Sequence, residues 1–200
     1  MSASASIRSG KNILRKEIKK KVAMLSEQEK ERQSRIVTEK LLKLPQIQNC
    51  RRVCLYLNMP DEVKTVPLLR TLLDTKKDCF VPQYIGPVMK MVKLKSFEDY
   101  ESLPTTKWNI KQPADDDVRE DALNTGGVDV MVMPGLGFTK DGSRLGRGKG
   151  YYDTYLEKCA KAGFSPFTVA LAFNEQICDM VPTDTNDVPI DLILYPSQGS

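Results

Sequence analysis

A chain of 200 residues is long enough for one substantial domain with a continuous core, and two full domains would be cramped. Apolar residues make up 40% of it and charged residues 28%, which is typical of a globular protein and excludes a disordered one. A net charge of +4 suits small anionic ligands, but it is too small and diffuse to indicate nucleic-acid binding.

The N-terminal part of the chain predicts a tail and two helices. Residues 1–10 are small and polar, and we expect them to form a loose tail. Residues 11–44 carry apolar side chains at three-to-four spacing, which is the helical pattern. Ser26 with Glu29 forms a capping-box signature for the start of the second helix, and Pro45 follows its end.

The next segment alternates strands with helical patterns. Residues 52–57 are rich in strand-forming side chains, and a turn leads from them to a predicted helix over 66–75. Two further strands are predicted over 79–82 and 88–94. Residues 97–127 are polar and irregular, and we expect them to run over the surface.

The C-terminal part continues the alternation. The apolar run 128–133 predicts a strand buried on both faces, and 150–162 predicts a helix. The last strands are predicted over 167–172 and 190–195. This order predicts an α/β fold, a three-layer α/β/α sandwich with a mostly parallel, mixed sheet, in a single domain over residues 1–200.

The cysteines favour a reducing compartment. Their number is odd, they form no CxxC pair, and with no histidine in the chain a zinc site is improbable. No window approaches the roughly 20 apolar residues that a membrane span needs. We therefore expect a cytoplasmic protein that binds neither membrane nor nucleic acid and that is a monomer.

The complete absence of histidine limits the chemistry. It excludes the Ser-His-Asp and Cys-His sites, the HExxH metal site and the usual general base near neutral pH. Any reaction must depend on carboxylates, lysine, arginine, tyrosine, backbone amides or a metal. Phosphoryl transfer fits this requirement, because it depends mainly on positioning and charge neutralisation.

The segment 144–150, Arg-Leu-Gly-Arg-Gly-Lys-Gly, combines alternate glycines with three cations between a predicted strand and a predicted helix. Glycines allow backbone amides to approach a phosphate, and the positive end of the following helix points at the same place. The segment is not a Walker A motif, because Ser143 stands at the first glycine position. Tyr151 likewise breaks a GxGxxG pattern. We interpret the segment as a phosphate site that follows neither pattern, in preference to a flexible basic loop.

Asp153 lies one turn into the predicted helix. Magnesium usually takes one or two carboxylates together with phosphate oxygens, so Asp153 is a candidate ligand. By itself, the residue is better explained as a favourable contact with the helix dipole.

Several motifs in order resemble one family, that of 5-formyltetrahydrofolate cyclo-ligases, also called methenyltetrahydrofolate synthetases. The resemblance runs from about Lys11 to Tyr195. The matching segments are Thr125–Val130 (TGGVDV), Pro134–Phe138 (PGLGF), Arg144–Asp153 (RLGRGKGYYD), Ala170–Phe173 (ALAF), Val181–Pro182 and Asn186–Asp187.

The resemblance implies an ATP- and magnesium-dependent cyclisation of 5-formyltetrahydrofolate to 5,10-methenyltetrahydrofolate, with release of ADP and phosphate. ATP and the folate, with or without a polyglutamate tail, would be the partners. The implied ATP contacts are Lys11, Asn12, Ile13, Leu14, Arg15, Arg144, Leu145, Gly146, Arg147, Gly148, Lys149, Gly150, Tyr151 and Tyr152. The implied folate contacts are Leu57, Glu62, Tyr84, Trp108, Arg147, Gly148, Lys149, Gly150 and Tyr151. Lys149 and Arg147 would be catalytic, and Asp153 and Asp187 would hold magnesium.

Each implied role has a plainer alternative. The basic segment 11–15 could be a solvated helix face, and Glu62 an exposed loop acid. Tyr84 and Trp108 could simply pack in the core, and Asp187 could belong to an acidic turn.

Three positions depart from the family pattern. Gln83 stands where a basic residue is common, which weakens an anion contact there. Thr139 replaces a common acidic residue, and Lys64 stands where an acid is frequent.

Two other functions are compatible with the residues. A sugar-phosphate isomerase or transferase could use a similar phosphate loop without ATP. A basic module could bind RNA or a partner protein with salt-dependent affinity, although that stretch lacks aromatic residues for base stacking. The cations that suggest it are Lys16, Lys19, Lys20, Lys21, Arg32 and Arg35.

Overall fold

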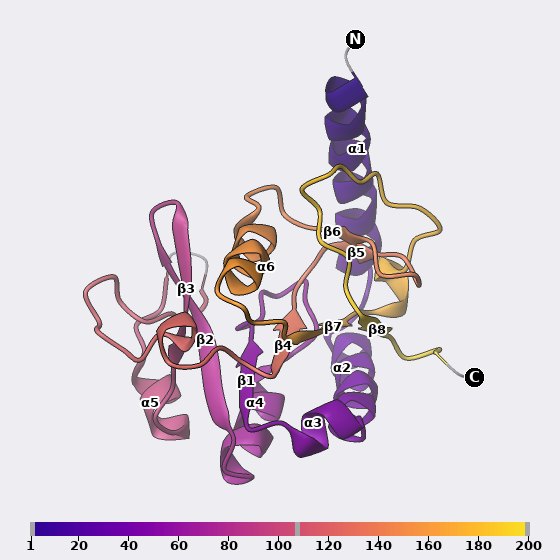
Figure 1. The fold of residues 1–200 in the computed structure, drawn as a ribbon. Helices are drawn as coiled ribbons and strands as arrows, with labels where there is room; N and C mark the ends of the chain where they lie inside the picture. Colours follow the sequence, from indigo (N-terminus) through magenta and orange to yellow (C-terminus); the bar gives the residue numbers. More distant parts are fainter. Residues whose placement is uncertain (1–2, 107–108, 199–200) are drawn as a thin grey trace.

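A six-stranded sheet forms the centre of the computed structural model, which describes residues 3–106 and 109–198 (Figure 1). Its strand order is β3-β2-β1-β4-β7-β8, and all neighbours are parallel except β2 and β3, which form an antiparallel hairpin. The strands are β1 Arg52–Leu55, β2 Asp78–Ile85, β3 Val88–Lys93, β4 Val130–Met133, β7 Phe167–Leu171 and β8 Leu192–Leu194. The expected mostly parallel, mixed sheet is confirmed.

Helices cover this sheet and complete the alternation with strands. They are α1 Ala3–Ala23, α2 Glu27–Leu42, α3 Pro45–Asn49, α4 Val66–Asp74, α5 Phe97–Ser102 and α6 Tyr151–Lys161. Two 3₁₀ turns, η1 Ala122–Asn124 and η2 Asn174–Gln176, and a small ribbon of β5 Gly137–Phe138 with β6 Arg144–Leu145 complete the elements. No helix in the described ranges is both long and apolar enough to cross a bilayer.

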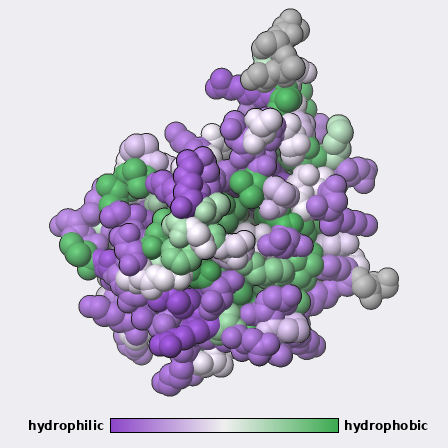
Figure 2. All heavy atoms as spheres, viewed as in Figure 1, coloured by the Kyte–Doolittle hydropathy of each residue, from purple (hydrophilic) through white to green (hydrophobic). Residues whose placement is uncertain are grey.

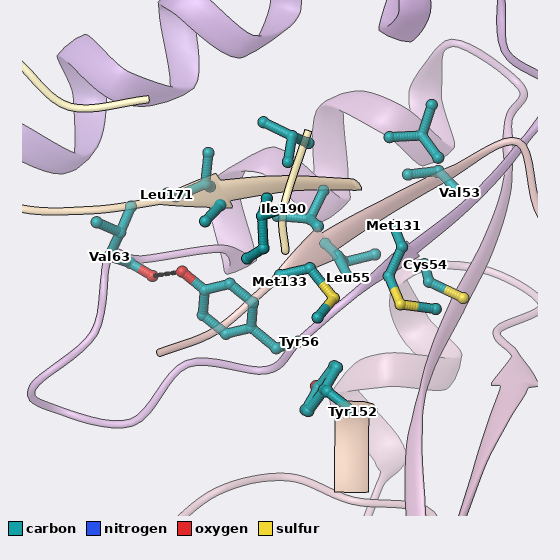
Figure 3. Close-up of a cluster of buried hydrophobic side chains, with 14 of the residues drawn as sticks. Val53, Cys54, Leu55, Tyr56, Val63, Met131, Met133, Tyr152, Leu171 and Ile190 are labelled. Atoms are coloured by element: carbon teal, nitrogen blue, oxygen red, sulfur yellow. Dashed lines mark hydrogen bonds between the residues drawn. The ribbon is translucent and has the colours of Figure 1, made fainter. Parts of the chain in front are cut away.

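The two innermost strands, β1 and β4, supply the centre of the core. Every residue of β4 is buried, because helices cover both faces of a parallel sheet. Cys54 of β1 pairs with Met131 of β4, and Figure 3 shows Leu55, Met131 and Met133 in one cluster. The apolar run of the sequence therefore lies in the middle of the sheet.

The crossovers around these strands run in opposite directions. From β1 the chain passes through α4 to β2 on one side, and from β4 it passes through α6 to β7 on the other. Because such crossovers are right-handed, α4 and α6 lie on opposite faces, as Figure 1 shows. This makes the expected three-layer sandwich. It also opens a crevice beyond the carboxyl ends of β1 and β4, which is where ligands bind in such sheets.

The expected loose tail over residues 1–10 is wrong for residues 3–10, which form the first turns of α1. Alanine and serine are compatible with a helix, so the segment extends the predicted helix toward the N-terminus. Gly10 lies against the ring of Pro182, 3.3 Å from where a Cβ would be, and Lys11 forms ion pairs with the same loop. Figure 1 shows α1 projecting from the body of the molecule.

Other local expectations are confirmed with small shifts in their ends. The Ser26 hydroxyl accepts a hydrogen bond from the Glu29 amide at 3.1 Å and caps α2. The polar stretch 97–127 is not irregular throughout, because it contains α5 and η1, and the ion pair of Arg119 with Asp99 joins two parts of it. All five cysteines are free thiols.

Candidate active site

Two loops meet in the crevice beyond the carboxyl ends of β1 and β4. The loop after β1 brings Asp61 and Glu62, and residues 144–150, the glycine-rich segment that begins with β6, bring Arg147. Arg147 Nη2 lies 2.6 Å from Asp61 Oδ1 and 2.8 Å from Glu62 Oε1. Residues 85 positions apart therefore share one ion-pair cluster at the topological switch point.

Glu62 is buried, so it is not the exposed loop acid of the plainer interpretation. Its Oε2 accepts a hydrogen bond from the Met59 amide at 2.8 Å, and its other oxygen faces Arg147. Burial raises the pKa of Glu62, and the charge of Arg147 opposes that rise. A carboxylate of this kind is held in one orientation and is expensive to leave without a partner.

The loop that presents Glu62 is tied back to the core. The Tyr56 hydroxyl donates to the carbonyl oxygen of Val63 at 3.1 Å, as Figure 3 shows. Thr65 Oγ1 donates to the carbonyl of Tyr56 at 2.6 Å, which closes the loop at its base. Leu57, an implied folate contact, is buried in the core beside this loop.

Arg144 connects the glycine-rich segment to α6. Its Nη2 donates to Asp153 Oδ2 at 2.6 Å, and Nη1 donates to the Pro134 carbonyl at 3.3 Å. Its Nε is buried and has no hydrogen-bond partner among the described residues. Arg144 is thus a buried cation that fixes the start of α6 and retains an unused donor.

The two carboxylates expected to hold magnesium belong to segments that contact each other, and each carboxylate has a cationic neighbour. The amide of Val188, next to Asp187, donates to Asp153 Oδ1 at 3.2 Å. Lys11 Nζ lies 2.6 Å from Asp187 Oδ2 and 2.9 Å from Asp184 Oδ2. Across the described residues, no group of three or more acidic, cysteine or histidine side chains is placed to hold a metal ion. A metal there would need phosphate oxygens or water to complete its shell.

The N-terminal helix reaches the glycine-rich segment, as the resemblance implied. Arg15 Nε donates to the carbonyl of Gly146 at 2.9 Å, although 131 positions separate them in sequence. Its Nη1 donates to Asn12 Oδ1 at 2.7 Å. The guanidinium also lies 3.6 Å from where a Cβ on Gly148 would stand, and Gly148 has a φ of +102°. A side chain at 148 would therefore meet both backbone strain and Arg15.

Lys149 and Gly150 lie at the entrance to α6. Gly150 is its N-cap with a φ of +68°, a left-handed conformation that glycine adopts without strain. Lys149 is exposed, and its side chain makes no ion pair or hydrogen bond with the described part of the chain. Figure 2 shows pale and green residues gathered at the middle of the face that carries α6, with purple hydrophilic residues around them.

Aromatic side chains flank the entrance to α6. The Tyr151 ring lies against that of Tyr84 with a centroid separation of 4.9 Å, and its hydroxyl donates to the Gly86 carbonyl at 2.9 Å. Burial raises the pKa of Tyr84 to about 12. Tyr152 is buried, and Figure 3 shows it beside Tyr56. Trp108 lies outside the described residues.

The remaining implied contacts differ in their surroundings. Ile13 is exposed on α1, whereas Leu14 is partly buried against the core. Leu145 is buried in β6. Only Ile13 of these three presents its side chain outward, so any contact made by Leu145 would be through its backbone.

The family departures have structural roles of their own. Gln83 is buried and donates to the carbonyls of Ala114 and Asp117, at 2.5 and 3.1 Å. Thr139 accepts from the Ser143 amide at 3.0 Å and thereby holds the turn of the β5–β6 ribbon. Lys64 pairs with Glu31 of α2 at 2.5 Å.

Sequence analysis missed Asp61, Asp184 and Gln176. No local pattern marks Asp61, and only the fold places it on Arg147. Asp184 joins Asp187 at Lys11. The Gln176 amide nitrogen donates to the carbonyls of Gly135 and Leu136, at 3.0 and 3.1 Å, which holds the loop after β4. In the sequence, only the position of Gln176 shortly after the family motif Ala170–Phe173 pointed to a role for it.

Comparison with known proteins decides between the candidate functions. The family model of the 5-formyltetrahydrofolate cyclo-ligase family matches residues 7–196. The chain belongs to this family. The 5-formyltetrahydrofolate cyclo-ligase of Mus musculus is 47% identical over 196 residues, which cover 96% of this chain and 97% of that protein. A probable cyclo-ligase of Caenorhabditis elegans is 30% identical, covering 97% and 96%.

Solved structures of the cyclo-ligase family show the same fold. The NMR structure of Aquifex aeolicus 5,10-methenyltetrahydrofolate synthetase has a TM-score of 0.75 at 27% identity and covers 95% of this chain and 94% of that one. The synthetase from Mycoplasma pneumoniae gives 0.71 at 25% identity, covering 93% and 98%. The resemblance and the fold class are confirmed. Membership of this family favours a cyclo-ligase over a sugar-phosphate isomerase or transferase and over a basic binding module.

Proposed function

We propose that this protein catalyses the ATP- and magnesium-dependent cyclisation of 5-formyltetrahydrofolate to 5,10-methenyltetrahydrofolate, with release of ADP and phosphate. One observation carries the proposal beyond family membership. The glycine-rich segment, the N-terminal helix and the loop of the buried Glu62 converge at the switch point of the sheet. Cations for a polyphosphate and a fixed carboxylate for a heterocycle thus lie side by side.

The reaction suits a site without histidine. A formamide is a poor electrophile, and its oxygen is a poor leaving group. Transfer of the γ-phosphoryl group to the formyl oxygen releases ADP and makes the formyl carbon reactive. The neighbouring folate N–H nitrogen then attacks that carbon within the same molecule and loses its proton to solvent, the carbon–oxygen bond breaks, and phosphate leaves. No protein nucleophile is required.

The residues divide between the two substrates. Lys149 and Arg147 would neutralise charge on the transferred phosphoryl group, while Arg15, Lys11 and the backbone of the glycine-rich segment hold the rest of ATP. Glu62 would accept hydrogen bonds from the N–H groups of the pterin. Tyr84 and Tyr151 would lie against its ring.

The donor set fits magnesium in the presence of nucleotide. Asp153 contacts the segment of Asp187 through the Val188 amide, and magnesium commonly takes no more than two carboxylates from the protein. Bound there, it would offset the negative charge of the phosphates. We also propose that the protein is cytoplasmic and monomeric and binds no nucleic acid. The five free thiols suit a reducing compartment.

An absorbance assay for the methenyl product tests the reaction. We expect product only when ATP and magnesium are supplied together with 5-formyltetrahydrofolate. Equal product without ATP would refute the ligase assignment.

The variant Lys149→Ala tests the role of the glycine-rich segment. We expect it to fold normally and lose about 10²- to 10³-fold in rate, because a donor to developing charge is removed. Lys158→Ala is the matched control, since Lys158 is another exposed lysine farther along α6. Full activity in Lys149→Ala, or an equal loss in the control, would contradict the assignment.

A further inference from the structure

Both edges of the Arg147 guanidinium face carboxylates. On one edge, Nε and Nη2 lie 3.2 and 2.8 Å from Glu62 Oε1. On the other edge, Nη1 and Nη2 lie 3.2 and 2.6 Å from the two carboxylate oxygens of Asp61. A guanidinium binds a phosphate through one such edge with two parallel hydrogen bonds. Arg147 therefore has no free edge for a phosphate in this structure.

The two carboxylates differ in how readily they can leave. The Glu62 side chain is only 6% exposed, and it also accepts a hydrogen bond from the Met59 amide. Releasing it would leave a buried charge without its cation, which is costly. The Asp61 side chain is 31% exposed, and none of its described hydrogen bonds goes to a partner other than Arg147. Water can solvate Asp61 after release.

We propose that Asp61 occupies the edge of Arg147 that a phosphate group of ATP takes, and that nucleotide binding displaces it while Glu62 keeps Arg147 in place. This inference rests on the proposed function. Asp61 is then an internal competitor of the nucleotide, and it prevents an unpaired Arg147 from binding other anions. Glu62 is the anchor that turns the freed edge toward the phosphate.

Calorimetric titration with a non-hydrolysable ATP analogue and magnesium tests the displacement. We expect Asp61→Asn to bind the analogue about two- to fivefold more tightly than the wild type, the size of a half-exposed ion pair. Asp74→Asn, at the exposed C-terminal end of α4, removes the same charge and should leave affinity unchanged. Unchanged or weaker binding in Asp61→Asn would overturn the proposal.

A second background separates displacement from a general effect of charge. With Arg147→Lys, the parallel hydrogen bonds to Asp61 are lost while the positive charge stays. Adding Asp61→Asn to Arg147→Lys should then change affinity less than twofold. An equal gain in both backgrounds would show a long-range charge effect and refute the displacement. Circular dichroism confirms folding, and Asp61→Ser replaces Asp61→Asn if that variant misfolds.

The product assay distinguishes the two proposals. If the wild type forms methenyl product with ATP and Asp61→Asn gains no affinity, the displacement fails and the enzyme assignment stands. If the wild type binds the analogue and Asp61→Asn binds it more tightly, but no product forms, the nucleotide site stands and the reaction assignment fails. A wild type that binds no analogue refutes both.

Discussion

Glu62 combines burial with an ion pair, and these act in opposite directions on its ionisation. Burial is the larger effect and raises the pKa above the ordinary value of 4.5. The folded protein therefore holds this proton more tightly than the unfolded chain does. The stability that Glu62 contributes is fully present at low pH and is lost as pH rises from about 4.5 through the folded pKa.

Glu62→Gln removes this titration and tests it. We expect the wild type to lose stability relative to Glu62→Gln as pH rises above 4.5, measured by urea unfolding at several pH values. Glu157→Gln is a control of opposite sign, because Lys161 lowers the pKa of Glu157. If the difference in unfolding free energy between the wild type and Glu62→Gln stays constant with pH, the charge of Arg147 cancels the effect of burial on the pKa of Glu62.

At the residue scale, the cations of the site were predictable from the sequence and their partners were not. Arg144, Arg147 and Lys149 stand together in one short segment, and their spacing indicates a phosphate site. Asp61 lies 86 positions away from Arg147, and an ion pair over that distance depends on strand order. Glu62 came from the family resemblance, and its burial came from the fold.

At the scale of elements, the loop after β4 depends on one side chain of η2. Gln176 is buried, donates to two carbonyls of that loop and accepts from the Phe173 amide at 2.9 Å. The same loop accepts a hydrogen bond from Arg144 at Pro134. Gln176 thus fixes backbone that pairs with the start of the glycine-rich segment, because the Leu136 amide donates to the Leu145 carbonyl at 2.8 Å.

Gln176→Leu keeps the approximate volume and removes the hydrogen bonds. We expect it to lose about 1–3 kcal/mol of unfolding free energy, because buried backbone carbonyls lose their donor. Urea denaturation measures the loss, and Gln48→Leu, at an exposed position in α3, should change stability little. Equal stability of the two variants would show that water replaces the amide at the loop.

Arg119 joins two parts of the stretch 97–127 and ties them to β3, because its Nη1 donates to the Lys93 carbonyl at 3.2 Å. It contacts both Asp99 oxygens at 2.7 and 2.8 Å, and Asp117 at 2.7 Å, with only 8% of its side chain exposed. We expect Arg119→Met to cost about 1.5–3 kcal/mol. That loss lowers the melting temperature by roughly 3–12 °C in a domain of this size.

Calorimetric melting checks Arg119→Met, with Lys161→Met as its control. Lys161 pairs with Glu157 on the exposed face of α6, so its loss should change the melting temperature little. Arg119 also holds the pKa of Asp99 below its ordinary value. The deficit of Arg119→Met should therefore shrink as pH falls through the folded pKa of Asp99. If the stability deficit of Arg119→Met persists at low pH, the deficit comes from lost packing and not from the lost ion pair.

The long elements were predictable because each has a clear period or apolar run. The strands β1 and β4 and the helices α4 and α6 lie within a few residues of their expected ranges. The ribbon β5–β6 was not predictable, because strands of two residues are too short to show an alternation of apolar and polar side chains. The start of α1 also depends on a tertiary contact, that of Gly10 with Pro182.

At the scale of the whole molecule, strand order builds the site. β1 and β4 are neighbours in the sheet although 74 residues separate the end of β1 from the start of β4. Only this adjacency brings Glu62 to Arg147. The N-terminal helix and the 182–187 segment close the other side through Lys11. A ligand bound at the proposed site would therefore touch segments from both ends of the chain.

This arrangement predicts that nucleotide stabilises α1. The helix projects from the body (Figure 1), and its middle is held by Lys11 and by the contact of Arg15 with Gly146. If ATP bridges these cations and the glycine-rich segment, opening of the helix requires release of the ligand. Amide hydrogen exchange over residues 3–14 should then slow by up to about 100-fold at a ligand concentration 100 times Kd.

Hydrogen exchange with the ATP analogue and magnesium measures this coupling. Helix α5, which packs against α4, serves as the internal control and should exchange at the same rate with and without ligand. Lys11→Met should reduce the protection of α1, because it removes the cation that joins the helix to Asp187. Identical exchange of α1 in both states would mean that the helix takes no part in binding, and the N-terminal ATP contacts would then be wrong.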